Sequence, residues 1–436
     1  MIDAVSAVLV CGDEVFVIQR QLNLRAFPGY WAFPGGKVDK SDHWEYPGQD
    51  ARLLGALRRE VVEELGLDLA HESVERIDLL GLAETPDFNP QRFATRFYKV
   101  TLRAKPTFTV DEGEAMHAGW YSAAALLIQY RAGELLAVPP IINILNALGE
   151  DIARREVPAL AYSYDNAVEV PMIESLYGVR QLMPRSHTLP PAERTNSLLI
   201  GDDGAPKVLV DPSPRDEAEL AKYLRVVERY GVDLVLLTHH HGDHHEYAPV
   251  IARRYGVPIL LSTDTRERLT RKHPGYFDDI ASRDLHEGDE VTTWLGHAVK
   301  VHTVPGHDEG QIALAPANMA WFLAGDLFQG VGTVVIGGDE GDMQKYMATL
   351  KKVIALRPRA LYPSHGIALG GTHILEKTLE HRLMREDQVL QLHDAGKSED
   401  EILVTLYGEL APGLIPYARE NIRAHMVKLG REGRLK

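Results

Sequence analysis

A dense run of histidines with one aspartate is the stretch of the sequence best suited to chemistry. Residues 238–245 read Thr-His-His-His-Gly-Asp-His-His and follow the apolar run Val232–Leu237, which predicts a buried strand. Imidazoles packed this closely repel one another when protonated, whereas neutral imidazoles are good ligands for Zn²⁺. Taken alone, the tract is compatible with a metal site, with an adventitious metal patch, and with an ordinary loop.

Three further potential ligands follow, each directly after a predicted strand. His307 ends Val-Pro-Gly-His, Asp326 ends Ala-Gly-Asp, and His365 lies in Tyr-Pro-Ser-His-Gly. Imidazole and carboxylate groups are the usual ligands of divalent transition metals. Their repeated placement after strands favours a metal site over a chance patch of histidines.

A second candidate site lies on a helix predicted over Asp50–Leu65 and ended by a glycine. Glu60, Glu63 and Glu64 stand at i, i+3 and i+4, so three carboxylates converge on one patch of this helix. Neighbouring negative charges repel unless a hard divalent cation lies among them, although a solvated acidic face is the simpler alternative. The predicted core stripe on the opposite face consists of Leu54, Leu57, Val61 and Leu65.

The segment Arg59–Leu67, with the Gly35-Gly36 turn upstream, resembles the Nudix box. Asp42 stands where the family's upstream glutamate is expected, and sixteen residues separate it from Arg59, more than the family pattern has. A similar expansion is a feature of the coenzyme A diphosphatases. Thr85-Pro86, the run 92–98 and Pro139-Pro140 also resemble that branch.

The Nudix resemblance implies hydrolysis of a diphosphate bond in a small nucleoside diphosphate derivative. It implies that Mg²⁺ or Mn²⁺ is held by Glu60, Glu63 and Glu64, with the last two also catalytic. The resemblance further implies a catalytic carboxylate at Glu114 and substrate-binding arginines at Arg92 and Arg96. Ordinary surface arginines, and a Nudix domain that only binds a ligand, are the alternatives.

The histidine-rich set resembles the metallo-β-lactamase superfamily in order, spacing and flanking residues. The resemblance implies two metal ions, Zn²⁺ as the first expectation with Mn²⁺ or Fe as alternatives, that activate water and stabilise developing charge. It implies that His239, His241 and His307 hold one metal, that Asp243, His244 and His365 hold the second, and that Asp326 bridges the two. It also implies that Asp243 is catalytic and that Asp211 is a supporting residue. His240 and His245 are expected not to be ligands.

Within that superfamily, the segments 342–347, 381–386 and 421–429 resemble the lactamase-beta-like endoribonuclease group. The likeness favours single-stranded RNA as the substrate, with a glyoxalase-like thioesterase as the alternative. Between Arg419 and Lys436 there are six Lys or Arg residues against two Glu. An RNA path along the tail would use cations and stacking rings. The expected members are Arg382, Arg385, Tyr407, Tyr417, Arg423, Lys428, Arg431 and Arg434.

These motifs divide the 436 residues into a predicted Nudix α/β/α sandwich at 1–155, a metallo-β-lactamase αβ/βα sandwich at 156–372, and a winged-helix-like helical cap at 373–436. The single cysteine, Cys11, argues against a disulfide framework and favours a cytoplasmic location. No apolar stretch is long enough to cross a bilayer. A net charge of -15 argues against general nucleic-acid binding and against a DNA-binding regulator.

Overall fold

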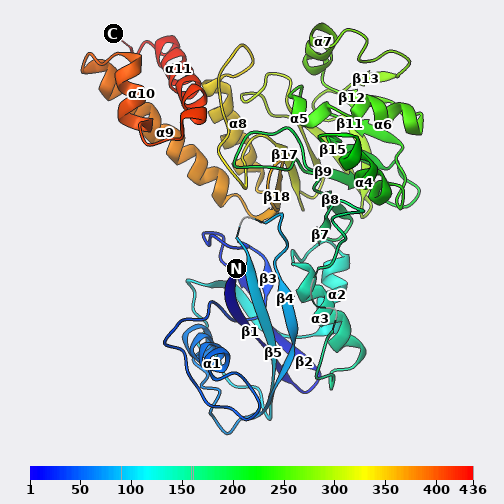
Figure 1. Cartoon of the computed structure of the whole chain (residues 1–436), viewed down its shortest axis with the longest axis vertical. Helices are drawn as coiled ribbons and strands as arrows, with labels where there is room; N and C mark the ends of the chain where they lie inside the picture. Colours follow the sequence, from blue (N-terminus) through cyan, green and yellow to red (C-terminus); the bar gives the residue numbers. More distant parts are fainter. Residues whose placement is uncertain (90, 159, 161, 436) are drawn as a thin grey trace. The chain divides into compact units, whose positions relative to one another are not determined.

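The computed structural model describes residues 1–89, 91–158, 160 and 162–435. The chain forms two compact units (Figure 1). The first unit comprises 1–166 and 171–180, and the second comprises 167–170 and 181–436. Among the residues described, no helix combines the length and apolar character needed to span a membrane.

The first unit is a sandwich built on one mixed sheet with the strand order β3-β2-β1-β5-β4, to which β6 adds by pairing with β2. Helix α1 packs with Val5, Ala7 and Leu9 on one face, while α2 and α3 pack with Val8 and Val10 on the other. The predicted α/β/α layers are thereby confirmed. The elements are β1 (Ile2–Cys11), β2 (Glu14–Arg20), β3 (Trp31–Ala32), α1 (Ala51–Leu65), β4 (Val74–Glu84), β5 (Phe93–Leu102), β6 (Ala115–Ser122), α2 (Ala123–Arg131) and α3 (Pro139–Glu150).

Helix α1 forms where its sequence predicts it. The Asp50 side chain caps the first turn by accepting from the backbone N–H groups of Arg52 and Leu53, and Gly66 ends the helix in the left-handed conformation. The four leucine and valine residues of the predicted stripe are 0–1% exposed. This packing fixes the rotation of the helix, which leaves the Glu63 carboxylate exposed and the Glu64 carboxylate buried.

The second unit contains two sheets, as the metallo-β-lactamase resemblance implies. Within this unit one sheet has the order β13-β12-β11-β10-β9, and the other has the order β14-β15-β16-β17-β18-β19; β7 and the first half of β8, which continue the first order, consist of residues assigned to the first unit. The strands are β7 (Met172–Leu176), β8 (Val179–Leu182), β9 (Ser197–Ile200), β10 (Val208–Val210), β11 (Leu234–Leu236), β12 (Ile259–Leu261), β13 (Ser282–Asp284), β14 (Glu290–Trp294), β15 (His297–Thr303), β16 (Ile312–Pro316), β17 (Phe322–Gly325), β18 (Ala360–Pro363) and β19 (Leu369–Gly370). The helices that accompany them are α4 (Glu217–Val227), α5 (Gly242–His245), α6 (Ala248–Tyr255), α7 (Thr263–Lys272) and α8 (Met343–Leu356).

The candidate ligands of the second unit lie just beyond strand ends of both sheets. The histidine tract follows β11, while His307, Asp326 and His365 follow β15, β17 and β18. Strands β17 and β18 pair in parallel, so their carboxyl ends lie at the same edge of the sheet. Segments distant in the sequence are thereby brought to one place.

The tail is helical throughout its described part and belongs to the second compact unit. It consists of α9 (His373–Asp394), α10 (Glu399–Tyr407), a short 3-10 helix (Pro412–Leu414) and α11 (Ile415–Arg431), and both α9 and α11 contact α8 (Figure 1). A capping box at Ser398 begins α10. The described tail residues after β19 contain helices and no strand, and the three-domain boundaries stay a prediction.

Candidate metal centre and active sites

The histidine tract and His307 form the first candidate ligand group. His241 Nδ1 lies 3.0 Å from His239 Nε2 and 3.0 Å from His307 Nε2. The ligand atoms of the three residues all lie within 4.8 Å of one another. Three imidazole nitrogens converging in this way suit a divalent transition metal.

Asp243, His244 and His365 form the second group, also within 4.8 Å. The Asp243 Oδ2 atom is 3.5 Å from His365 Nε2 and 3.8 Å from His244 Nε2. The mixed carboxylate and imidazole donors again fit a divalent metal.

Asp326 faces both groups. Its Oδ2 atom lies 3.5 Å from His307 Nε2, whereas its Oδ1 atom lies 3.7 Å from both His244 and His365 Nε2. One carboxylate oxygen therefore points to each group, as a bridging ligand requires. The neighbouring histidines hold the pKa of Asp326 well below its ordinary value, against the effect of burial.

Each of the five ligand histidines has a partner on the ring nitrogen that faces away from its group. Such partners fix the ring orientation and the tautomer of a metal-binding histidine. The partners are the Thr238 hydroxyl for His239, the Glu340 carboxylate for His241, the Asp211 carboxylate for His244, the Val335 carbonyl for His307 and the Arg194 carbonyl for His365.

Buried polar atoms that lack a hydrogen-bond partner indicate whether a metal ion would fit the site. His244 Nε2 and Asp326 Oδ1 are buried with no hydrogen-bond partner, although such atoms are normally satisfied. Both atoms face the second ligand group. Burial and the surrounding histidines lower the pKa of His239 well below 6.5, which keeps its ring in the neutral, ligating form. The residues present therefore fit two metal ions.

The carboxylate cluster of the first unit is organised by an arginine. Arg59 lies 2.8 Å from Glu60, 3.1 Å from Glu63, and pairs with Asp42 through two nitrogens at 2.8 and 3.1 Å. The upstream acidic residue therefore joins the cluster despite the insertion before the helix.

Both glycines of the upstream turn lie too close to neighbouring atoms for a side chain to be added without displacing them. A Cβ atom at Gly36 would come within 2.4 Å of Glu60 Oε1, and one at Gly35 within 2.2 Å of the Val5 carbonyl. The Gly35 N–H also donates to Glu64 at 3.2 Å. The backbone contact and the φ of 149° require glycine at Gly35, whereas a side chain at Gly36 would displace the Glu60 carboxylate.

Comparison with known proteins agrees with both sites. The family model described as "Metallo-beta-lactamase superfamily" matches residues 190–365, and the NUDIX domain model matches residues 2–138. The chain carries both domains. Both are hydrolase families that use divalent metals, so the chain is a metal-dependent hydrolase.

Relatives match the metallo-β-lactamase part. The chain is 29% identical over 261 residues to the "Beta-lactamase-like protein 2 homolog" of Drosophila melanogaster, covering 56% of this chain and 84% of that protein. It is 27% identical over 200 residues to the "Atrochrysone carboxyl ACP thioesterase" of Aspergillus fumigatus, covering 45% of this chain and 58% of that protein. A beta-lactamase domain protein from Burkholderia ambifaria shares the fold, with a TM-score of 0.52, 23% identity and coverage of 62% and 90%.

The sequence resemblance assigns Asp211 a supporting role, and the structure places this residue beside His244 and Thr238. Its Oδ2 atom accepts from the Thr238 hydroxyl at 2.6 Å and lies 2.9 Å from His244 Nδ1, while Oδ1 accepts from the Thr238 N–H. The residue adopts a positive φ of 46°, a costly conformation that the surrounding contacts hold in place. The Asp243 and Asp211 carboxylates outweigh burial and raise the pKa of His244 to about 10.

Sequence reasoning missed two carboxylates beside this site. Asp308 is fully buried against His240 Nδ1, and Lys272 Nζ lies 2.9 Å from His240 Nε2, so both ring nitrogens of His240 have partners. Glu340 lies in a loop and contacts His241. His245 packs against Tyr276 instead of the ligand groups. Neither carboxylate follows a recognisable motif, so only the folded loops reveal them.

Three sequence-predicted residues of the NUDIX domain have less direct placements. Glu114 contributes to raising the pKa of Glu64, so its charge acts near the cluster. Arg92 donates to the Thr85 carbonyl at 3.1 Å, and Arg96 pairs with Asp3 at 3.1 Å. Neither arginine contact involves the carboxylates of α1. Their assignment to substrate binding stays a prediction.

The Glu64 carboxyl gives the NUDIX domain a testable pH dependence. Burial, with the nearby Glu60 carboxylate, raises the pKa of Glu64 to about 8. A metal ion needs the ionised form and must displace a proton below this pH. We expect Mg²⁺ affinity, measured by titration calorimetry, to increase as pH rises towards 8 and then level off. The Glu64→Gln variant should lose this increase, and an affinity independent of pH in the parent protein would contradict the assignment.

Proposed function

We propose that the chain is a bifunctional enzyme with two separate hydrolytic sites. The NUDIX site cleaves the diphosphate bond of a nucleoside diphosphate derivative, of coenzyme A type, with Mg²⁺ or Mn²⁺ at the α1 carboxylates. The metallo-β-lactamase site, with two Zn²⁺, Mn²⁺ or Fe ions, cleaves an acyl thioester. The observation that carries the second assignment is the pocket above the ligand groups.

The NUDIX proposal is supported by the charge balance of the cluster. Glu60 and Glu63 share one guanidinium, which Asp42 already engages. Among the hydrogen bonds of the described residues, the Glu64 carboxylate accepts only from the Gly35 N–H. Desolvation raises the pKa values of both Glu60 and Glu64, so the ionised cluster is incompletely compensated by the protein. A divalent cation, followed by a diphosphate, restores that balance.

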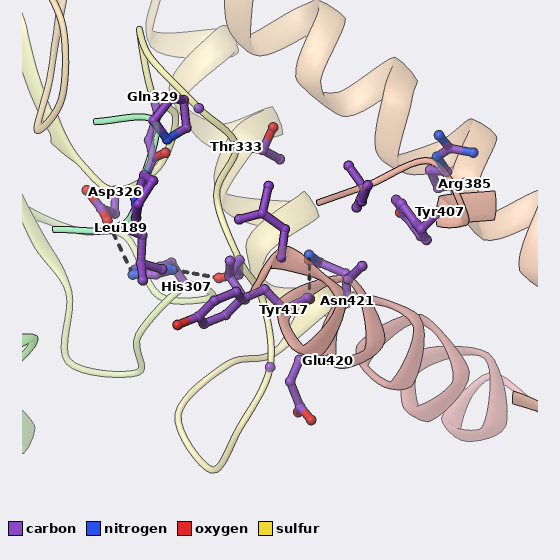
Figure 2. A pocket seen from close by; sticks show the side chains of 18 of the residues that line it. Leu189, His307, Asp326, Gln329, Thr333, Arg385, Tyr407, Tyr417, Glu420 and Asn421 are labelled. Carbon is purple, nitrogen blue, oxygen red and sulfur yellow. Dashed lines mark hydrogen bonds and ion pairs between the residues drawn. The ribbon is translucent and has the colours of Figure 1, made fainter. Parts of the chain in front are cut away.

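The pocket of the metallo-β-lactamase domain has a volume of about 1280 Å³ and extends from the ligand groups to the tail helices. Figure 2 shows His307 and Asp326 on one side of it, and Tyr407 and Arg385 on the other. Its lining includes aliphatic side chains from several segments, such as Leu189, Val404, Leu406, Leu410 and Leu414. An elongated pocket with apolar walls suits an acyl chain beside a hydrolytic centre.

The pocket also carries carboxylates, namely Glu340, Glu409 and Glu420. Carboxylates repel a phosphodiester backbone but tolerate a neutral acyl group. The relative from A. fumigatus is named as an atrochrysone carboxyl ACP thioesterase. These points favour a thioester over RNA.

The tail cations expected to contact RNA are largely engaged by the protein itself. Lys428 lies 2.8 Å from Glu386, Arg423 lies 3.1 Å from Glu399, and Arg431 pairs with Asp342 at 2.5 Å. Each of these charges is already compensated, so little net positive charge is left for a polyanion.

Arg385 is the specific feature that keeps single-stranded RNA as the second candidate. It lines the pocket, its guanidinium carbon lies 4.9 Å from the centre of the Tyr407 ring, and its Nη1 atom donates to the neutral Gln388 at 2.8 Å. A guanidinium stacked on a ring can bind a phosphate. That phosphate could belong to RNA or to the far end of a phosphopantetheine thioester.

Each residue of the metallo-β-lactamase site has a proposed role. The bound metal ions supply water activation and charge stabilisation. Asp243 is 15% exposed at its side chain, lines the pocket and faces His365, so we assign it to orienting the attacking water. Asp211 and Glu340 hold His244 and His241 in place.

A substrate panel tests the second assignment. Full-length protein loaded with Zn²⁺ should hydrolyse medium-chain acyl-CoA and acyl-pantetheine substrates and leave single-stranded RNA intact. Arg385→Met should raise KM for acyl-CoA about tenfold, the loss of roughly one charge-assisted contact, while a phosphate-free acyl thioester keeps its KM. RNA cleavage without thioester cleavage would replace this proposal with the ribonuclease alternative.

A further inference from the structure

The metal-facing position of His307 depends on a carbonyl group in a loop. His307 Nδ1 lies 2.8 Å from the Val335 carbonyl oxygen, which leaves Nε2 directed at His241 and Asp326. Val335 belongs to an irregular segment, 330–341, with no regular secondary structure of its own. Something outside that segment must therefore fix the carbonyl.

The two residues that flank Val335 are held by the C-terminal helices. Arg382 of α9 donates to the Val334 carbonyl at 2.5 Å, and the Ile336 N–H donates to Asn421 Oδ1 of α11 at 3.0 Å. Arg382 also donates to the same Asn421 oxygen at 3.0 Å. The three contacts form a closed arrangement around one peptide segment (Figure 2 shows Asn421 on the tail side of His307).

A second contact joins the same arginine to the other side of the metal centre. The Arg382 guanidinium carbon lies 5.5 Å from the centre of the Tyr346 ring, and the Tyr346 hydroxyl donates to the Leu327 carbonyl at 2.8 Å. Leu327 directly follows the bridging Asp326. Tyr346 also packs so closely on Gly306, which precedes His307, that a Cβ atom there would come within 2.3 Å of its backbone.

We propose that Arg382 and Asn421 are positioning residues for the metal centre. Through them the C-terminal helices fix the orientation of a metal ligand of the metallo-β-lactamase domain. The arrangement holds the Val335 carbonyl, which orients His307, and it braces the chain on both sides of the metal ligands. This inference rests on the proposed metal site and is independent of the substrate.

Burial makes these contacts specific. Arg382 is 3% exposed and Asn421 is 7% exposed, so neither gains its hydrogen bonds from water. The planar guanidinium donates in fixed directions to two acceptors at once and stacks on a ring, which a lysine ammonium cannot reproduce. Arg382 was expected from sequence to contact RNA, and its burial and contacts point to this internal role instead.

Simple docking of the tail is the competing explanation, and the chain offers a control for it. Arg419 lies on α11 two residues before Asn421 and pairs with Glu399 at 2.8 Å and Asp400 at 2.6 Å of α10. The Arg419→Met change disturbs the packing of the tail helices without touching 334–336. If Asn421 is a positioning residue, Arg419→Met should leave the Zn²⁺ affinity at the parental value, whereas Asn421→Leu should lower it.

The test is metal affinity in the full-length chain, measured by competing Zn²⁺ against a chromophoric chelator. In Asn421→Leu, the Ile336 N–H and Arg382 lose their acceptor, and one of the two Zn²⁺ ions should bind about 10–100-fold more weakly, as for other residues that orient metal ligands. Asn421→Asp keeps the acceptor and should retain parental affinity. Arg382→Lys should resemble Asn421→Leu, and Arg419→Met the parent.

Thermal unfolding of the metal-free variants measures the effect of each substitution on folding, so that this effect is known separately from the effect on Zn²⁺ affinity. Positioning requires weaker binding of one ion in Asn421→Leu with rescue by Asn421→Asp, whatever the shift in Tm. Parental Zn²⁺ affinity in both Asn421→Leu and Arg382→Lys, or equal weakening in Arg419→Met, would overturn the inference. Failure of the parent chain to bind two Zn²⁺ ions would instead overturn the proposed metal site.

Discussion

Replacing Asp326 by asparagine is expected to abolish turnover at the metallo-β-lactamase site and to reduce the bound metal from two ions to one or none. Each carboxylate oxygen faces a different ligand group, and an amide has only one oxygen to offer. Its NH₂ group would point at imidazole nitrogens that should bind metal. A loss of about 4 kcal/mol of charge stabilisation corresponds to roughly a thousandfold in rate.

Elemental analysis and steady-state kinetics on the same samples check this expectation. Asp339→Asn is the matched control, because Asp339 is an exposed carboxylate in the nearby 330–341 segment. It should retain both ions and parental turnover. NUDIX activity should be unchanged in both variants. An Asp326→Asn protein that holds two ions and turns over normally would refute the bridging role.

The candidate ligands of the metallo-β-lactamase site are largely predictable from the sequence, because short segments of the chain contain the residue types and spacing that identify them. The histidine tract fixes five ring positions within seven residues, and the isolated His307, Asp326 and His365 follow recognisable strands. The division of the ligands between two metals came from resemblance alone. In the structure, the two oxygens of Asp326 give that division a geometric basis.

The tail shows what a linear pattern leaves out. Its basic residues predict a nucleic-acid surface when counted along the chain, but their partners are distant in sequence. Arg423 pairs with Glu399, and Arg382 is buried against the Val334 carbonyl. Charge counting records residue types and not their partners, so it cannot distinguish a solvated cation from one that serves the fold.

The insertion in the NUDIX domain presents the opposite case. The sequence leaves the role of Asp42 open, because sixteen residues separate it from Arg59. In the structure the inserted segment packs on the α1 side of the core through Trp44 and Tyr46, and Asp42 is 8% exposed and paired with that arginine. The lowered pKa of Asp42, caused first by its hydrogen bond with Arg59, keeps it ionised. The longer spacing therefore does not keep Asp42 from pairing with Arg59.

The second large effect is expected at Glu63 and Glu64, where replacement by glutamine should remove Mg²⁺-dependent diphosphate hydrolysis. Glutamine has nearly the same shape as glutamate but carries no charge, so the variants isolate the contribution of charge to metal binding. At Glu64 the isosteric amide also preserves an acceptor for the Gly35 N–H. We expect roughly a thousandfold loss of rate, because a metal contributes several kcal/mol to stabilising charge on the reacting phosphate.

Hydrolysis of coenzyme A and of dinucleotides, followed by product chromatography, provides the measurement. Glu75→Gln is the matched control, since Glu75 is an exposed carboxylate on β4 of the same unit. Thioester hydrolysis at the second site should be unchanged in all three variants, which shows that the two sites work independently. A parent protein that binds a nucleoside diphosphate derivative without cleaving it, with Glu63→Gln and Glu64→Gln binding it equally well, would make the NUDIX domain a ligand-binding module.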